Sequence, residues 1–411
     1  MVLGGDTLSA VGSGLTLPFF LVYLTRVRGI DVTVAGFALS TVALTGFVGN
    51  PVGGWLTDRI GARRALVCGL LVAGAGAFLV TLIREPWHAF TAASVVGFGA
   101  AVIWPAQDAL LAVVVAPEQR SSVFAMRNAT LNAGFGLGAL VASLIADLSS
   151  PASFVTLYVI DGLSYLAFVP ILVVLLPSSG ERQVEPAGST AADVPASYRT
   201  VLRDRTFLRF WALIALLVAI GFAQTHAGFP AYATRDGGIG AGGLSVAFAA
   251  NTLTVVAAQL LVLRAMEGRR RTTAIALACL LWGTAWAMTI FAGGLGSGPV
   301  AVLTFAAALA VFGLGETFLA PSQAAMANDL APDKLRGRYN GLYTMAWTTG
   351  FTIGPIVAGV ALGAGNGTAL FVGLIVACGV AALAATRLAH HLPASVNVIG
   401  AHQAIDDTSS A

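Results

Sequence analysis

Twelve long apolar stretches constrain this chain more than any other feature of its sequence. A helix that crosses a lipid bilayer needs roughly 20 apolar residues, and each stretch reaches about that length. The stretches are continuous rather than alternating, which excludes the strands of a membrane β-barrel. Only 10% of the 411 residues are charged, against about 25% in soluble domains. We therefore predict an all-α membrane protein with twelve transmembrane helices, at about residues 3–25, 33–56, 65–83, 89–115, 121–146, 153–176, 208–233, 241–263, 272–292, 299–327, 339–363 and 368–389.

The basic residues indicate how these helices are oriented. Loops on the cytoplasmic side of a membrane carry an excess of Arg and Lys. If both termini lie inside, the inner segments hold 17 of the 22 basic residues, and the outer loops hold four, Arg26, Arg28, Arg84 and Arg235. Arg127 falls within a helix. This division predicts a multi-pass protein of the cell membrane with both termini in the cytoplasm.

A polar segment and an internal repeat divide the chain into two halves. Residues 177–206 are rich in Pro, Ser, Ala, Glu and Asp and predict a flexible cytoplasmic linker. They separate a six-helix bundle at 1–176 from a second at 207–392, and the polar tail at 393–411 is expected to be disordered. Several residues recur 216 positions later: Pro105-Ala106-Gln107 matches Pro321-Ser322-Gln323, Arg120 matches Arg336, Gly134 matches Gly350, and Gly138 matches Gly354. These matches imply two pseudo-symmetric bundles related by an axis along the membrane normal.

The inner loop between the second and third helices carries a known pattern. It reads GGWLTDRIGARRAL at residues 53–66, and Gly54, Asp58, Arg59, Gly61 and Arg63 match G-x-L-x-D-R-x-G-x-R/K. This loop, with the helix count and the repeat, resembles the signature of the major facilitator superfamily. The resemblance implies a transporter whose two bundles rock about a central site, and it implies that the loop acts as a conformational latch.

The resemblance also suggests partners for the loop. Asp58 would face the start of the eleventh helix, near Arg338, in the other half. Arg59 and Arg63 would pair with acids such as Asp108 or Glu118. The alternative is that these charges only fix the orientation of the chain in the membrane.

Four ionisable side chains within or near apolar stretches are candidates for proton coupling. Charged groups at membrane depth are costly and usually have a function or a partner. Glu316 lies near the middle of the tenth helix, which usually lines the central cavity in this family. Asp161, Asp6 and His226 lie in the sixth, first and seventh helices. The alternative for each is a hydrogen-bonded structural role.

Other residues indicate packing and charge neutralisation. Arg127 and Asp108 lie at similar depth in neighbouring helices, which predicts a buried ion pair. Small residues four positions apart allow close approach of two helices, and proline bends a helix. The helix-packing candidates are Gly134, Gly138, Gly350, Gly354 and Pro355. Drug–proton antiporters of the family have a glycine–proline signature in the fifth helix, where this chain has Ala139.

Aromatic and amide side chains are candidates for lining a substrate cavity. Few charges converge there, which favours a neutral, amphipathic or weakly cationic solute. The chain has no G-x-x-x-x-G-K motif for ATP, no metal-ligand cluster and no catalytic constellation, so we expect neither an enzyme nor a cofactor. The cavity candidates are Phe19, Phe20, Tyr23, Trp104, Gln107, Gln224, Asn251 and Gln323.

These observations favour a secondary active transporter that works by rocker-switch alternating access. The specific hypothesis is proton-coupled efflux of a small amphipathic drug or metabolite by a monomer, that is, an antiporter of the multidrug-resistance type. A proton-coupled nutrient or sugar symporter of the same fold is the first alternative. A membrane receptor or scaffold that transports nothing is the second. No basic run with interleaved aromatics suggests nucleic-acid binding.

Overall fold

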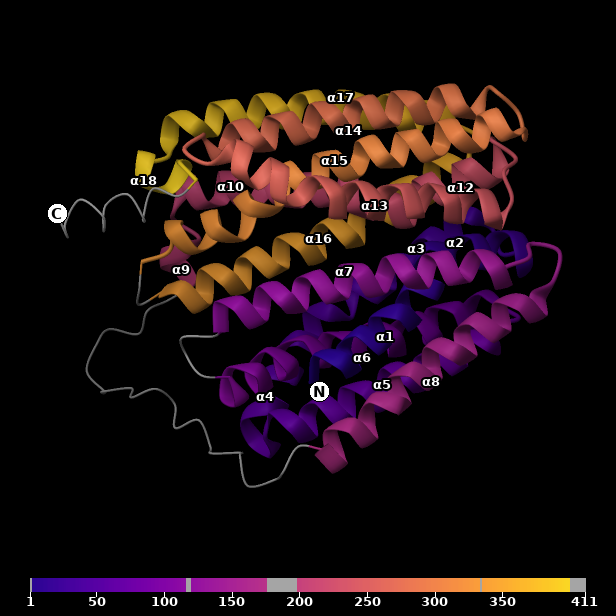
Figure 1. Ribbon diagram of the computed structural model, residues 1–411, viewed down its shortest axis with the longest axis horizontal. Helices are drawn as coiled ribbons and strands as arrows, with labels where there is room; N and C mark the ends of the chain where they lie inside the picture. The colour runs from indigo at the N-terminus through magenta and orange to yellow at the C-terminus, as the bar shows by residue number, and fades with distance from the viewer. Residues whose placement is uncertain (1, 116–119, 176–197, 333–334, 400–411) are drawn as a thin grey trace.

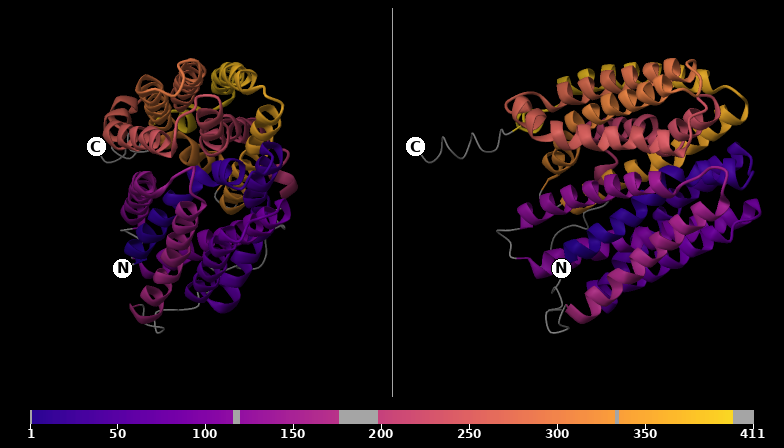
Figure 2. Two further views of the ribbon diagram at one scale, coloured as in Figure 1. Left: turned by 90° about the vertical axis from the view of Figure 1, so that its right-hand side faces the viewer. Right: turned by 45° about the vertical axis from the view of Figure 1, so that its right-hand side comes forward.

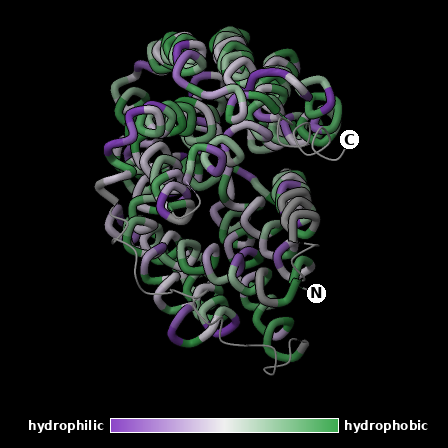
Figure 3. Tube along the Cα trace, turned by 90° about the vertical axis from the view of Figure 1, so that its left-hand side faces the viewer, coloured by the Kyte–Doolittle hydropathy of each residue, from purple (hydrophilic) through white to green (hydrophobic). Residues whose placement is uncertain are grey.

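The computed structural model describes residues 2–115, 120–175, 198–332 and 335–399, and these residues are almost entirely helical. Eleven helical stretches among them are long and apolar enough to cross a membrane. The remaining predicted span is also a helix, α7 (Arg120–Ile145), whose shorter apolar part is Thr130–Ala142. The predicted all-α membrane fold is therefore confirmed, and Figure 3 shows hydrophobic residues along most helices.

The first half of the chain forms one bundle. Its spans are joined by short turns, and α5 packs against α6 and α8, while α1 packs against α7 and α8. The elements are α1 (Val2–Thr16), η1 (Leu17–Phe19), α2 (Phe20–Val22), η2 (Tyr23–Val27), α3 (Val32–Leu44), α4 (Gly46–Ile60), α5 (Ala62–Thr81), α6 (Pro86–Val114), α7 and α8 (Pro151–Leu175).

The second half forms the other bundle, which Figures 1 and 2 show in rose, orange and yellow beside the first. Here α15 packs against α13 and α14, and α14 packs against α17. The elements are α9 (Tyr198–Val201), α10 (Arg205–Leu217), η5 (Val218–Phe222), α11 (Ala223–His226), α12 (Gly228–Arg235), α13 (Ala241–Met266), α14 (Arg271–Gly293), α15 (Pro299–Leu330), α16 (Arg336–Gly363), α17 (Gly367–Leu388), η7 (Ala389–His391) and α18 (Ala394–Asn397).

The first and seventh spans are interrupted helices. In the first span the 3-10 turn η1 contains Pro18, which cannot donate a backbone hydrogen bond, and the π-turn η2 follows. In the seventh span the π-turn η5 separates α10 from α11. Such local changes in helical repeat bend a helix. The first span of each half is therefore a bent helix.

The two ends of the molecule differ in how tightly the halves meet. We call the end with α9, α18 and the turns at 60–62 and 266–271 the linker end. The far end carries the turns at 28–31, 82–85, 146–150, 236–240, 294–298 and 364–366. Within the described chain α3 packs extensively against α16, whereas α4, which continues the same span toward the linker end, barely touches it. The halves are thus closed at the far end and part toward the linker end.

Glycine allows the close contact at the far end. A Cβ atom on Gly36 would lie 2.9 Å from Cα of Gly359 and 2.5 Å from the carbonyl oxygen of Pro355. Thr33 Oγ1 donates a hydrogen bond to the carbonyl of Gly359 at 3.3 Å. The second and eleventh spans therefore meet backbone to backbone.

The C-terminal segment is folded where disorder was expected. The prediction of a disordered tail from residue 393 is wrong for Pro393–Ile399, while residues 400–411 lie outside the described chain. The N–H of Gly268 donates to the carbonyl of Ile399, and the N–H of Ile399 donates to the carbonyl of Arg269, both at 3.0 Å. These bonds pair the tail with the turn between α13 and α14, whose backbone groups would otherwise lack partners.

Side chains reinforce this pairing. Asn397 Oδ1 accepts a hydrogen bond from the N–H of Thr272 at 3.1 Å, in the first turn of α14. Arg271, which is 7% exposed, donates to the carbonyl of Val396 at 2.8 Å and forms an ion pair with Asp329. The tail thus holds the start of α14 against the end of α15.

Replacing Asn397 by alanine should destabilise the protein. The substitution removes the acceptor for an N–H group in the first turn of α14, a loss that costs about 0.5–2 kcal/mol in helix caps. We expect a lower melting temperature in detergent for Asn397→Ala. The control is Ser395→Ala, at an exposed position of α18; equal melting temperatures for the two variants would contradict this role for Asn397.

Replacing Gly36 by valine should open the far end. The added side chain would overlap α16, and overpacking of this kind costs about 1–3 kcal/mol. Spin labels at Ser149→Cys and Ser297→Cys, with the three native cysteines replaced by alanine, would measure the separation of the halves at this end. We expect a longer distance in Gly36→Val and no change in Gly379→Val, a helical position with open space around it. An unchanged distance in Gly36→Val would mean that this contact does not keep the far end closed.

Candidate functional site

The signature loop lies at the linker end of the first half. α4 ends at Ile60, and Gly61 turns the chain at φ +90°, a conformation that residues with a side chain rarely adopt. Asp58 is exposed, and the guanidinium of Arg59 lies 5.3 Å from the ring centroid of Trp55. Gly54 has open space around it.

The two arginines of this loop do not have the partners that the sequence suggests. Arg63 donates to the carbonyl of Val173 on α8 at 2.7 Å. Asp108 is bound instead by Arg127, and Glu118 lies outside the described chain. In this conformation the loop is therefore tied to the last helix of its own half.

Three helices of the first half meet at the guanidinium of Arg127. It donates to Asp6 Oδ2 on α1 at 2.9 Å, and to Asp108 Oδ1 at 2.5 Å and Gln107 Oε1 at 2.7 Å on α6. The ring of Trp104 lies over it at 5.1 Å. The pair that the sequence suggests, Asp108 with Arg127, is thus joined by a second carboxylate. We call Asp6, Gln107, Asp108 and Arg127 the arginine cluster.

One side of the arginine cluster is buried and the other is accessible. The side chains of Asp6 and Arg127 are 5% and 6% exposed, whereas that of Asp108 is 53% exposed. Trp104 is also about half exposed. Two carboxyl groups thus share one guanidinium, and the accessible one, Asp108, lies toward the linker end of α6.

Asp161 on α8 is buried in the first half without a cation. Its Oδ2 accepts a hydrogen bond from Thr16 Oγ1 at 2.8 Å, while its Oδ1 has no partner in the described chain. Asp161 borders a cavity of about 40 Å³, as do Phe20 and Tyr158, whose hydroxyl also lacks a described partner. Gly12 leaves room here, because a Cβ there would overlap Ser164 and Asp161.

The other aromatic candidates of the first span are packed inside the bundle. Phe19 is fully buried against Phe154. Tyr23 is also fully buried, donates to the carbonyl of Val80 at 3.2 Å, and accepts from Arg28 Nε at 2.7 Å. Neither side chain faces the space between the halves in this conformation.

Glu316 is the corresponding uncompensated carboxylate of the second half. Its Oε2 accepts a hydrogen bond from Asn251 Nδ2 at 3.0 Å, which joins α15 to α13. Asn251 Nδ2 also lies 3.2 Å from the carbonyl of Leu309. The ion pairs of the described residues involve neither Glu316 nor Asp161.

The remaining polar candidates connect helices of the second half. Gln224 donates to the carbonyls of Ala219 and Gly354 at 2.8 and 3.1 Å. Gln323 accepts from the hydroxyl of Tyr343 at 3.3 Å. His226 Nδ1 has no partner in the described chain, although its ring lies 6.1 Å from that of Phe351.

A row of half-buried aromatic rings lies along η5 and α16 and was missed by the sequence reasoning. Phe222 lies 5.0 Å from Trp347, and Trp347 lies 6.1 Å from Phe351. His226 continues the row. A repeat at i and i+4 on α16 could have suggested the pair Trp347 and Phe351, but only the fold adds Phe222 from the seventh span.

The glycines predicted to pack helices make corresponding contacts in the two halves. Gly134 and Gly138 of α7 meet the backbone of α1, where Cβ atoms would overlap Thr7 and Val11. In the second half, Gly350 and Gly354 of α16 contact the seventh span at Val218 and Ala219. The carbonyl of Pro355, next in the chain, faces Gly36 across the two halves.

Removing the guanidinium of Arg127 should strongly destabilise the first half. In Arg127→Gln the buried carboxylate of Asp6 would lose its counter-charge, a change that costs about 3–5 kcal/mol in buried pairs. We expect a large drop in melting temperature and partial recovery in the double variant Arg127→Gln with Asp6→Asn. Asp108→Asn, at the exposed side of the cluster, should lower the melting temperature less than Arg127→Gln does. An equally large drop in melting temperature would contradict the assignment of Asp6 as the carboxylate that most needs the guanidinium.

Comparison with known proteins identifies relatives among transporters. The chain is 26% identical over 361 residues to a Na(+), Li(+), K(+)/H(+) antiporter of Planococcus maritimus, covering 79% of this chain and 80% of that one. It is 25% identical to the uncharacterized MFS-type transporter YdeE of Escherichia coli, with 82% of each chain covered. The quinolone resistance protein NorA of Staphylococcus aureus is 25% identical over 181 residues, 43% of this chain and 46% of NorA.

Solved structures share the same fold at low sequence identity. The nucleoside transporter NupG has a TM-score of 0.75 at 14% identity, covering 94% of this chain and 98% of that one. A proton dependent oligopeptide transporter has a TM-score of 0.73 at 16% identity, with 95% and 98% covered. The sequence profile of the Major Facilitator Superfamily matches residues 3–303 and 225–403. This transporter, which is not an enzyme, therefore belongs to the Major Facilitator Superfamily.

Proposed function

We propose that the protein exports a small amphipathic molecule in exchange for protons. In this scheme it acts as a monomer in the cell membrane, with the linker end in the cytoplasm. The basic residues support that orientation, because most of them lie in segments at the linker end. The name of NorA, a quinolone resistance protein, supports an exported drug-like solute.

The two uncompensated carboxylates, Asp161 and Glu316, are the observation on which proton coupling rests. Each lies in a membrane-spanning helix, and each is hydrogen bonded to one neutral side chain, Thr16 or Asn251. A carboxylate at this depth without a counter-charge is costly, and binding of one proton removes that cost. Two such groups, one in each half, can take up and release protons as the halves move.

The half-buried aromatic row supports the class of solute. Phe222, Trp347 and Phe351 offer flat apolar faces, and aromatic rings favour stacked or edge-to-face contact with other rings. The accessible sides of Trp104 and Asp108 lie in the other half. A flat, weakly cationic solute would meet apolar surface on one side and negative charge on the other.

The present conformation fits one state of an alternating-access cycle. The far end is closed by α3 against α16, and the halves part at the linker end. Movement to the opposite state would bring α4 toward the start of α16. Asp58, which is exposed here, would then face that helix start as the latch hypothesis requires.

A second candidate function is exchange of monovalent cations for protons. The relative from Planococcus maritimus, which aligns with 79% of this chain, is named for that activity. The arginine cluster has two carboxyl groups for one guanidinium, and the carboxyl group of Asp108 is accessible to a cation. Ion flux and solute flux must therefore be measured in parallel.

Substitution of the two carboxylates tests the proposal. In proteoliposomes with an imposed pH gradient, Glu316→Gln and Asp161→Asn should each lower proton-driven flux of a fluorescent quinolone at least about tenfold, because the amides cannot bind and release a proton at this depth. Exchange of quinolone molecules between the two sides of the membrane, measured without a pH gradient, should persist in both variants. The control is Glu267→Gln, at an exposed turn.

The outcomes separate the candidate functions. Quinolone efflux that drives proton uptake supports the proposal, and co-movement of solute and proton would favour a symporter. Sodium flux without quinolone flux would favour cation exchange. Full proton-driven flux in both carboxylate variants would exclude Asp161 and Glu316 as coupling groups.

A further inference from the structure

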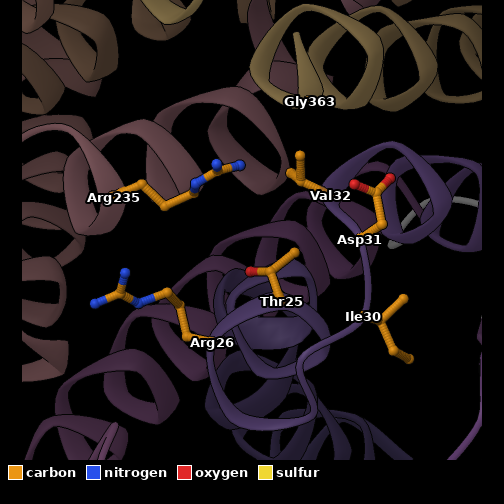
Figure 4. Close-up of a pocket in the computed structure, with 7 residues that line it drawn as sticks. All are labelled: Thr25, Arg26, Ile30, Asp31, Val32, Arg235 and Gly363. Atoms are coloured by element: carbon orange, nitrogen blue, oxygen red, sulfur yellow. The ribbon is translucent and has the colours of Figure 1, made fainter. Parts of the chain in front are cut away.

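A cavity of about 260 Å³ lies at the far end, between the two halves (Figure 4). The segment that joins the first two spans contributes one wall, and the ends of α12 and α16 contribute the other. Figure 4 shows Arg235 reaching from its helix toward Val32, with Thr25 and Arg26 on the opposite wall. The lining residues are Thr25, Arg26, Ile30, Asp31, Val32, Arg235 and Gly363.

The two arginines of this cavity, Arg26 and Arg235, have no hydrogen-bond or ion-pair partner among the described residues. Arg26 and Arg235 are both exposed, and neither makes a described hydrogen bond or ion pair. Nearby Arg28 is different: it donates to the hydroxyl of Tyr23 and to the carbonyl of Thr81. Arg28 is thus bound within the fold, whereas Arg26 lines the cavity without such bonds.

Nearby carboxylates only partly offset this positive charge. Asp31 Oδ1 accepts hydrogen bonds from the N–H groups of Thr33 and Val34 at 2.9 and 3.2 Å and so caps α3. Asp236, which follows Arg235 in the chain, does not line the cavity. Partial burial raises the pKa of the Asp236 carboxyl, and the charge of Arg235 opposes that rise. The cavity lining itself has two guanidiniums and one carboxylate, which is engaged as a cap.

The cavity depends on closure of the far end. The carbonyl of Val32 lies next to Gly359, and its side chain lies next to Gly363, so the lining adjoins the contact between α3 and α16. Arg26 belongs to one half and Arg235 to the other. Their like charges repel when the halves close, and an anion between them would turn that repulsion into attraction.

We propose that this cavity binds a phosphate-bearing anion that bridges Arg26 and Arg235 and stabilises the far-end-closed state. The planar guanidinium matches phosphate oxygens in a two-point contact. The volume has room for a phosphate with an ester substituent. The anion is either free phosphate or the headgroup of a phospholipid, because the cavity lies where the spans end. The proposal goes beyond the transport function and does not depend on which solute is carried.

Thermal unfolding in a phosphate-free maltoside detergent tests the site. Inorganic phosphate is titrated against chloride at matched ionic strength, and short-chain phosphatidylglycerol is titrated in a separate arm. We expect a saturable rise in melting temperature for the unmodified protein. The apparent Kd should be at least about tenfold weaker in Arg26→Gln and in Arg235→Gln, the loss expected for one charge-assisted hydrogen bond. Arg84→Gln, which removes an exposed arginine elsewhere at the far end, should leave it unchanged.

A distance measurement separates this site from other anion effects. With the Ser149→Cys and Ser297→Cys labels, the bound anion should increase the population of the short far-end distance in the unmodified protein and not in the Arg26→Gln, Arg235→Gln double variant. Stabilisation by inorganic phosphate identifies free phosphate as a ligand, and stabilisation by the lipid alone identifies a headgroup. Equal stabilisation of the double variant and the unmodified protein, or no phosphate-specific effect in either arm, would overturn the proposal.

Discussion

Close backbone contact between helices is the constraint on which the rest of the structure depends. Lipid tails are as apolar as leucine, so burial of apolar surface does little to hold membrane helices together, and packing must do so instead. Gly134 and Gly138 bring α7 against α1, and Gly350 and Gly354 bring α16 against the seventh span. The same kind of contact at Gly36 joins the two halves. Small residues thus build the bundles and also form the surface along which they separate.

Charges inside the bundles fall into two groups with different physical consequences. Each nitrogen of the Arg127 guanidinium donates to an acceptor on α1 or α6, so any change in this site must break an ion pair or a hydrogen bond. Asp161 and Glu316 have only neutral donors, so their charge state can change without breaking an ion pair. The ion-paired carboxylates therefore lie in helix segments nearer the linker end, whereas Asp161 and Glu316 lie nearer the middle of their helices.

Local sequence signals predicted the fold well and the site only in part. The spans and the contact of Arg127 with Asp108 were predictable, because long apolar runs and isolated charges in them are visible without knowing the fold. The participation of Asp6 was not, since 121 positions separate it from Arg127. Phe19 and Tyr23 were assigned to a cavity because their type fits one, but the break at η1 turns them into the bundle. The polar tail looked disordered because its partners at Gly268 and Thr272 lie far away in the sequence.

The folded tail has a mechanical consequence. Backbone bonds between Ile399 and the turn before α14 fasten the end of the second half to its own middle, so that half is a closed loop of chain. In the described part of the first half, the corresponding bond comes from the side chain of Arg63, which donates to the carbonyl of Val173. Under the same load a backbone pairing deforms less than one long side chain does. We therefore expect the second half to be the stiffer of the two, so that bending between conformations concentrates in the first.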